Sequence, residues 1–156
     1  MITNERIFDE IDLKILEILQ DKARIPNAEV ARQVGMAPSA VLERIRKLEQ
    51  QGVIQGYEMR LDPACFGQGL VAFVELQVTG AGEIGAQLAR IYGVQEVFQT
   101  SGDSNYLVKL RVTSPRELGE RLRDEFASLT GVVRVSARIV LEIFKETRKI
   151  NLEQTS

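Results

Sequence analysis

The sequence predicts an α+β chain in which three helices precede a four-stranded antiparallel sheet that carries two further helices. In the first third of the chain, apolar residues recur at the spacing of one helix face. From residue 70 onward, segments of alternating apolar residues and two helical segments follow in the order strand, helix, strand, strand, helix, strand. A hydrophobic fraction of 44% with 27% charged residues agrees with a globular chain of this kind.

Three helices are predicted at the N-terminal end of the chain, over residues 9–20, 28–34 and 38–51. Asn27 is expected to cap the second helix, which Gly35 ends, and Pro38 suits the first turn of the third. A short helix, a turn that contains glycine and a longer helix together form a helix-turn-helix. We therefore assign residues 1–52 to a helix-turn-helix domain of the winged-helix type.

The outward face of the third helix is rich in hydrogen-bonding side chains. Its apolar stripe of Val41, Ile45 and Leu48 is expected to face inward, which places Ala40 and Arg44 on the flanks. An α-helix fits the major groove of DNA, where Arg and Lys reach guanine, Glu accepts from cytosine and Ser near a helix start bonds phosphate. The candidate DNA contacts are Ser39, Ala40, Glu43, Arg44, Arg46 and Lys47. The alternative interpretation of this face is a solvated helix surface.

Charge is unevenly distributed along the chain, although the net charge is only −2. Residues 1–21 hold two basic and six acidic side chains, whereas residues 22–47 hold six basic and two acidic ones. A local concentration of positive charge attracts phosphate groups. The charge distribution therefore agrees with double-stranded DNA as the partner of the third helix.

The residue inventory argues against an enzyme. The chain has no histidine, which removes the commonest general base and most transition-metal sites, and its single cysteine, Cys65, excludes an internal disulfide. We therefore expect no catalytic residue, no metal site and no cofactor. Neither a run of about 18 apolar residues nor a signal peptide at the start MITNERIFDE is found, so we expect a cytoplasmic protein that does not contact a membrane.

Residues 53–69 are expected to form a linker strand and hinge, because 53–62 alternates like a strand and is followed by Pro63, Gly67 and Gly69. Residues 70–156 form the second domain, with strands predicted over 70–78, 94–101, 105–112 and 132–144. Its second helix starts at a capping box that runs from Ser114 to Glu117. This is the ferredoxin-like βαββαβ pattern, in which two helices cover one face of an antiparallel sheet.

The last strand and the uncovered face of the sheet carry two further expectations. The strand is predicted to direct inward Val133, Val135, Ala137, Ile139, Leu141 and Ile143. The uncovered face mixes phenylalanine and valine with charges of both signs, which suits packing against a second copy. A homodimer is also what two helix-turn-helix domains need to read a palindromic DNA site.

Between the second and third strands lies the polar stretch TSGDSNY, which is a candidate binding loop. Exposed amides around Gly102 can bond a carboxylate, while Asp103 and the side-chain oxygens of Ser104 and Asn105 can accept from an ammonium group. The candidate effector-binding residues are Thr100, Ser101, Gly102, Asp103, Ser104, Asn105 and Tyr106. A plain hairpin turn built from turn-forming residues is the alternative.

Over nearly its whole length the chain resembles transcriptional regulators of the Lrp/AsnC, or feast/famine, family. The resemblance is carried by FDEIDLKILEILQDKARIPNAEVARQVGMAPSAVLERIRKLEQQGVIQGYEMRLDPACFG and by TSGDSNYLVKLRV. It implies an N-terminal DNA-binding domain and a ferredoxin-like domain that dimerises, assembles further into octamers or related rings and often binds an amino acid. It also implies that the effector lies beside the loop from Thr100 to Tyr106, at contacts between subunits.

The chain departs from the family pattern at two positions. Asn105 stands where the family often has aspartate, so the negative charge expected to pair with the ammonium group of the effector is missing at this position. Three alternatives follow: Asp103 pairs with the ammonium group instead, the effector is not a simple amino acid, or there is no effector. Ala37 stands where serine or threonine usually caps the third helix, and the missing cap should cost about 1 kcal/mol of helix stability.

Two other classes of protein share features with this sequence. Gly80 to Gly85 match the glycine fingerprint of dinucleotide-binding folds, but a hairpin follows the motif and too little chain remains for a doubly wound sheet. The second rival is an amino-acid sensor that acts through a protein partner and does not bind DNA. Salt-dependent affinity for duplex DNA distinguishes that sensor from a DNA-binding regulator.

Overall fold

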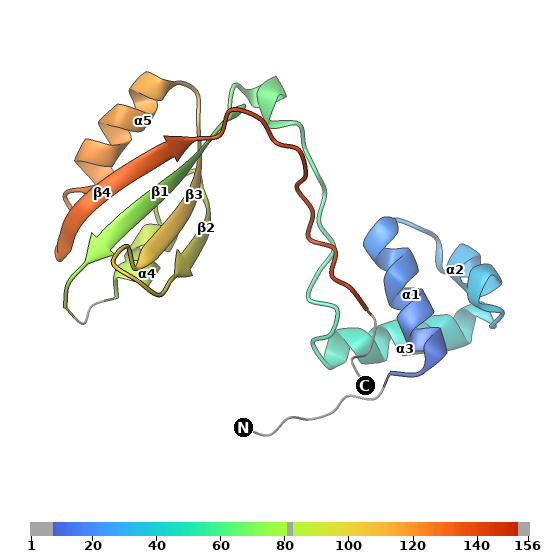
Figure 1. Cartoon of the computed structure of the whole chain (residues 1–156). Helices are drawn as coiled ribbons and strands as arrows, with labels where there is room; N and C mark the ends of the chain where they lie inside the picture. The colour runs from blue at the N-terminus through green and yellow to red at the C-terminus, as the bar shows by residue number, and fades with distance from the viewer. Residues whose placement is uncertain (1–7, 81–82, 153–156) are drawn as a thin grey trace. The chain divides into compact units, whose positions relative to one another are not determined.

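The computed structural model describes residues 8–80 and 83–152 (Figure 1). The chain divides into two compact units, Met1–Arg60 with Glu146–Ser156, and Leu61–Lys145. Among the described residues, no helix has both the length and the apolar character needed to cross a membrane. Within the stretch from Gly80 to Gly85 that matches the glycine fingerprint, Ala81 and Gly82 lie outside the described residues.

The first unit is built from three helices, α1 (Glu10–Asp21), α2 (Asn27–Val34) and α3 (Pro38–Gln50), shown together in Figure 1. Asp9 caps α1, since its side chain accepts from the backbone N–H of Asp12 at 2.8 Å. The helices meet in one apolar core, which consists of the buried residues Ile15, Leu19, Val30, Ala31, Val41 and Ile45. The predicted three-helix cluster is confirmed.

The starts of α2 and α3 differ in how well the sequence predicted them. Asn27 is not the cap of α2, because the extended backbone of Pro26 places that proline at the cap and Asn27 inside the helix. The carbonyl of Pro26 accepts from Glu29 and Val30 in the first turn. Ala37 precedes α3 without a side-chain cap, as predicted, and Pro38 begins the helix.

The chain returns to the first unit at its C-terminal end. The side-chain amide of Gln20 donates to the carbonyl of Ile150 at 3.2 Å and accepts from its N–H at 2.9 Å. Lys149 forms an ion pair with Asp21, and Arg148 pairs with Glu58 at 2.7 Å. Residues 148–150 therefore contact the last turn of α1 and Glu58 of the linker.

The predicted linker strand over residues 53–62 is not formed, because these residues make no strand ladder. A strand requires a partner for its backbone groups, and none of the sheet pairings includes this segment. Its alternating apolar side chains are exposed, namely Tyr57, Met59 and Leu61. Beyond it, a short 3-10 helix spans Pro63–Phe66 and Gly67 follows with a positive φ of 68°.

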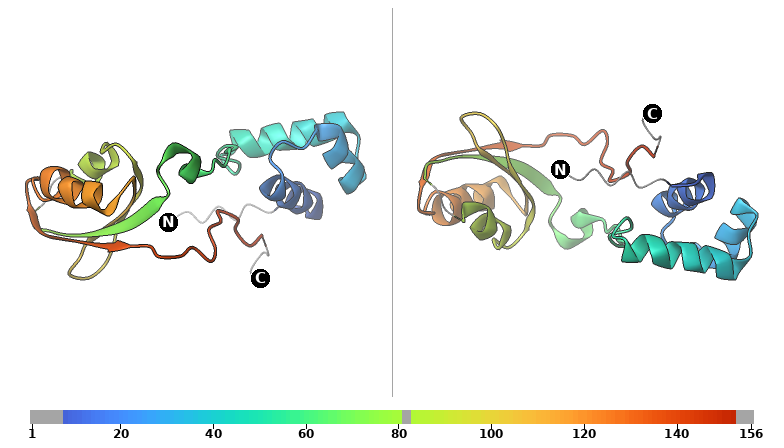
Figure 2. Two further views of the ribbon diagram at one scale, coloured as in Figure 1. Left: turned by 90° about the horizontal axis from the view of Figure 1, so that it is seen from above. Right: turned by 90° about the horizontal axis from the view of Figure 1, so that it is seen from below.

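The second unit is a four-stranded sheet with helices on one face. The strands are β1 (Leu70–Val78), β2 (Val94–Gln99), β3 (Tyr106–Val112) and β4 (Val132–Ile139), in the order β2-β3-β1-β4 with every neighbouring pair antiparallel. The helices α4 (Ile84–Ala89) and α5 (Pro115–Arg121) lie over the same face in both views of Figure 2. This arrangement confirms the predicted βαββαβ fold.

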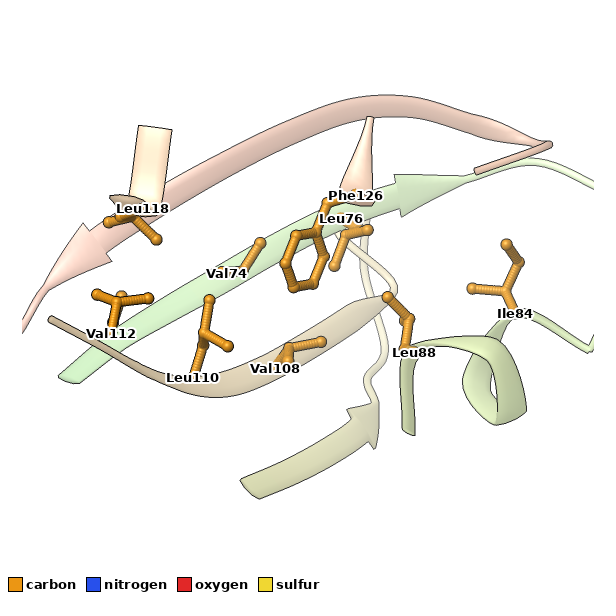
Figure 3. Close-up of a cluster of buried hydrophobic side chains, with 10 residues drawn as sticks. Val74, Leu76, Ile84, Leu88, Val108, Leu110, Val112, Leu118 and Phe126 are labelled. Carbon is orange, nitrogen blue, oxygen red and sulfur yellow. The ribbon is translucent and has the colours of Figure 1, made fainter. Parts of the chain in front are cut away.

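The core of the second unit lies between the sheet and these helices, as Figure 3 shows. Val74 and Leu76 of β1 and Val108 and Leu110 of β3 point toward the helices and are fully buried. From the helical side the core receives Ile84, Leu88, Leu118 and Phe126. The alternation of apolar residues along β1 and β3 predicted this buried face correctly.

The inward face of β4 differs from the prediction because of a β-bulge. Val78 pairs with Val132 while Gln77 pairs with Arg134, which leaves Val133 as one extra residue on β4. Val133 is therefore 61% exposed, and Val132 packs against the core in its place. The strand also ends at Ile139, so Leu141 and Ile143 are exposed rather than directed inward.

The helix that begins at Pro115 changes its hydrogen-bond pattern near its end. After α5 the chain forms one π-helical segment over Leu122–Phe126, in which the N–H of Ala127 donates to the carbonyl of Leu122 at 2.9 Å. The buried guanidinium of Arg121 fixes α5 by donating to Glu125 at 2.9 Å and to the carbonyl of Tyr92. This segment directs Phe126 into the core.

The N-terminus of α5 has the predicted cap with one difference. Ser114 accepts from the N–H of Glu117 at 3.1 Å, but the Glu117 carboxylate accepts from the N–H and hydroxyl of Thr113, at 2.7 and 2.5 Å, rather than from Ser114. The pKa of Glu117 lies below its usual value of 4.5, because the hydroxyl and the N–H of Thr113 donate to the carboxylate and Arg121 adds a nearby positive charge. The ionised carboxylate therefore stabilises the folded state.

We predict that Glu117→Ala lowers the melting temperature at pH 7 by about 2–4 °C, the cost of a lost cap interaction. Because the folded-state pKa of Glu117 is lowered, its contribution is present above pH 4.5 and is lost as pH falls through the folded-state value. The difference from wild type should therefore shrink in melting curves recorded below pH 4.5. Glu120→Ala on the same helix removes an exposed pair with Arg116 and should change little. An equal deficit at every pH would contradict this role of Glu117.

Candidate functional site

The helix-turn-helix of the first unit is α2, the turn from Gly35 to Ala37, and α3. Gly35 adopts a left-handed backbone with φ of 71°, which L-amino acids with a side chain rarely adopt. The N–H of Met36 then donates to the carbonyl of Ala31 at 3.0 Å, which closes the end of α2. Val41, Ile45 and Leu48 bury one side of α3 and thereby fix which side faces outward.

The outward side of α3 carries the predicted set of polar side chains. Ala40 on its flank is half-buried. Arg46 and Glu43 form an ion pair of 3.2 Å on the surface, where their side chains remain 58% and 73% exposed. The face prediction is confirmed by the exposure of Ser39, Glu43, Arg46, Lys47 and Gln50. These side chains are accessible to a partner molecule.

Arg44 differs from Arg46 because its guanidinium binds side chains at the start of another helix, α1, rather than a neighbour on α3. Its Nη1 lies 2.6 Å from Oδ2 of Asp9 and 2.7 Å from Oδ1 of Asp12, both at the start of α1. These hydrogen bonds raise the pKa of Arg44, and the pKa of Asp9 is lowered first by the N–H of Asp12 and then by Arg44. Spacing along the sequence holds no signal for this contact, since the partners lie 35 and 32 positions earlier.

The polar loop of the second unit lies between β2 and β3 and is closed by Thr100. The N–H of Thr100 donates to the carbonyl of Asn105 at 2.9 Å, and its hydroxyl donates to the carbonyl of Ser104 at 2.7 Å. Gly102 lies at the exposed tip with φ of 104°, and a Cβ at this position would meet no atom within 4 Å. The tip is therefore open on the outside.

Asn105 was predicted to offer its side-chain oxygen to a ligand, and the structure shows a partner for it within the chain. Its Oδ1 accepts from the N–H of Val78, and its Nδ2 donates to the carbonyl of the same residue, both at 2.8 Å. Sequence reasoning missed this contact because Val78 lies 27 positions earlier and offers only backbone groups.

The other predicted loop residues divide into an exposed and a packed group. Ser101, Gly102 and Asp103 are exposed, and Ser104 is half-buried. Tyr106 is the first residue of β3 and packs against the core, where a Cβ at Gly85 of α4 would lie 3.4 Å from its ring. No group of three or more metal-ligating side chains gathers anywhere in the described part of the chain.

Family comparisons assign each half of the chain to a described class of domain. Residues 8–55 match the model of the winged helix-turn-helix DNA-binding domain, and residues 71–150 match that of the Lrp/AsnC ligand-binding domain. Together with the two units of the structure, these matches define a transcriptional regulator with a separate ligand-binding domain.

The chain has relatives that match it over most of its length. It is 36% identical to the HTH-type transcriptional regulator FL11 of Pyrococcus horikoshii, over 93% of this chain and 97% of the relative. It is 35% identical to the leucine-responsive regulatory protein of Escherichia coli K12, over 91% and 90% of the two chains. The chain belongs to the Lrp/AsnC family of transcriptional regulators.

Two solved structures show the same fold with a bound amino acid. A transcriptional regulator from Neisseria meningitidis in complex with L-methionine matches with a TM-score of 0.89 and 28% identity, covering 94% of this chain and 97% of that one. The feast or famine regulatory protein of Mycobacterium tuberculosis, complexed with L-methionine, matches with a TM-score of 0.86 and 31% identity, covering 92% and 99%.

Proposed function

We propose that this protein regulates transcription by binding specific sequences of double-stranded DNA through the outward face of α3. The observation that supports the proposal most directly is the exposure of Arg46 and Lys47 on the second helix of a helix-turn-helix. No other described element combines this position with a row of exposed donors and acceptors on one helix face.

Several side chains on the outward face and flank of α3 suit particular groups of a DNA duplex. Arg46 and Lys47 donate to guanine O6 and N7, and Glu43 accepts from the amino group of cytosine. Ser39 lies in the first turn, where its hydroxyl and the helix N-terminus suit a phosphate oxygen, and Ala40 offers a methyl group to thymine. Arg44, bound to Asp9 and Asp12, contributes mainly by holding α3 against α1.

The proposed regulator acts as a homodimer that assembles further into octamers or related rings. Residues 1–52 bind DNA, 53–69 serve as linker and hinge, and 70–156 carry oligomerisation and effector binding. The uncovered face of the sheet supports self-association, because it mixes an apolar ring with charges of both signs, as a face that packs against its own copy does. Phe73 lies opposite Arg138 across the β1–β4 pair, and Arg138 forms an ion pair with Glu75. Beyond β4 the side chains of Leu141 and Phe144 are 97% and 89% exposed.

The effector in this proposal is an amino acid that binds at the loop from Thr100 to Tyr106. The open tip around Gly102 offers backbone N–H groups to a carboxylate, and Asp103 offers a carboxylate to an ammonium group. The methionine complexes of two relatives support this class of ligand.

Binding of duplex DNA at increasing salt tests the proposed function. A regulator that neutralises several phosphates should bind duplex DNA at low salt, and its log Kd should rise with log salt by about 0.9 for each phosphate contacted. The rival function, a sensor that acts only through a protein partner, predicts no duplex binding even at low salt. That second result would refute the proposal.

A further inference from the structure

The side chain of Asn105 takes the place of a strand residue at the end of the β1–β3 pairing. The last paired residues of these strands are Leu76 of β1 and Tyr106, the first residue of β3. The residues that precede Tyr106 belong to the loop and not to β3. Val78, at the end of β1, would otherwise have no β3 residue opposite it. The Asn105 amide supplies both the acceptor and the donor, each at 2.8 Å, and so extends the ladder to Val78.

Of asparagine, aspartate and alanine at position 105, only asparagine can make both of these bonds. A carboxylate accepts but has no donor for the carbonyl of Val78, and alanine can do neither. Asn105 and Val78 are both half-buried, so losing a partner leaves a poorly hydrated backbone group unpaired. The chemistry of the contact therefore demands asparagine and not its acidic counterpart.

The position of Asn105 in the loop makes this contact a determinant of loop geometry. The carbonyl of Asn105 also accepts from the N–H of Thr100, so one residue joins the loop to its own start and to the end of β1. Asp103, in contrast, is exposed and makes no hydrogen bond or ion pair within the described part of the chain. Its carboxylate is the only formal charge between Thr100 and Tyr106.

We propose that Asn105 is a positioning residue of the effector loop and that Asp103 is its charged contact residue, an inference that rests on the effector site proposed above. The effector is then a molecule with a free ammonium group, and an N-acetylated amino acid or a 2-oxo acid of the same side chain should not bind. The carboxylate of Asp103 gives the ammonium group a charge-assisted hydrogen bond, which a neutral nitrogen cannot provide in the same form.

Four variants of the full-length protein separate the two roles: Asp103→Asn, Asn105→Ala, Asn105→Asp, and the double variant Asp103→Asn with Asn105→Asp. The twenty common amino acids, beginning with L-methionine, are first screened against wild type by thermal shift. The Kd of each stabilising amino acid and of its N-acetyl form is then measured for all variants. Hydrogen exchange at the Val78 amide is measured without ligand.

Asp103→Asn should raise the Kd about tenfold or more and leave both the ligand-free melting temperature and Val78 exchange unchanged. Asn105→Ala should accelerate exchange at Val78 about fivefold or more, because the amide loses its acceptor. The double variant keeps the net charge but moves the carboxylate to position 105, and it should not recover binding.

Recovery of binding by the double variant, or wild-type affinity in Asp103→Asn, would overturn the assignment of Asp103. Unchanged exchange at Val78 in Asn105→Ala would overturn the role of Asn105. If none of the twenty amino acids stabilises wild type, the effector function itself fails and Asp103 loses its proposed role with it. Val78 exchange still decides the role of Asn105 in that case.

Discussion

Replacing Arg46 and Lys47 with alanine should raise the Kd for a specific DNA site about 100-fold or more, because each side chain contributes a contact worth about 1–3 kcal/mol. Both residues are exposed on the outward face of α3, and neither contributes to the apolar core of the first unit. The double variant should therefore keep the melting temperature and the oligomeric state of wild type. Gel-shift titration measures the affinity, and light scattering checks the assembly.

A matched control removes the same charge elsewhere. Arg116 and Arg123 belong to the α5 region of the second unit, and their side chains are 89% and 69% exposed. Alanine at both positions lowers the net charge equally but should leave DNA affinity nearly unchanged. Wild-type affinity in the Arg46 and Lys47 variant would show that another surface reads DNA. An equal loss in the control would show that affinity depends on total charge alone.

Phe126→Ala should lower the free energy of unfolding of the second unit by about 3–5 kcal/mol. The ring is fully buried in the core that Figure 3 shows, where it lies beside Leu76 of β1. Its removal takes apolar area from the core and leaves a cavity between the sheet and the helical segment. Urea denaturation followed by circular dichroism measures the loss.

Phe66→Ala is the matched control, because Phe66 is 63% exposed and lies outside this core. Its replacement should change the unfolding free energy by no more than about 0.5 kcal/mol. If Phe126→Ala lowers the free energy of unfolding by less than about 1 kcal/mol, the Phe126 ring does not hold the helical segment against the sheet.

The features that the sequence predicted correctly are those with a local or periodic signal. Helical spacing identified α1 and α3, and the alternation of apolar residues identified β1 and β3. The stripe of Val41, Ile45 and Leu48 fixed the inner side of α3, and its outer side followed from geometry. The outward face of the candidate DNA-binding helix could therefore be predicted residue by residue.

The features that the sequence missed depend on contacts between distant positions. The bulge at Val133 shifts the register of β4 against β1 by one residue. Inward and outward positions of β4 are therefore exchanged before the bulge, so that Val132 rather than Val133 faces the core. The partners of Arg44 lie 35 and 32 positions earlier in the sequence, and the partner of Asn105 lies 27 positions earlier. No local pattern reveals contacts at such separations. The linker over 53–62 has strand-like alternation, yet it lacks a pairing partner in the single chain. These features all depend on which distant residues pair in the fold, and the local preference of a segment for helix or strand does not determine that pairing.

Selection of bound duplexes from a random DNA pool by the full-length protein tests the central claim most directly. If α3 reads the major groove as part of a dimer, the selected duplexes should share an inverted repeat whose half-sites are about 10 base pairs apart, or a multiple of that spacing. The Arg46 and Lys47 double variant should fail to enrich the same sequence. A pool that remains random after selection by wild type, or the same repeat enriched by the double variant, would contradict the account.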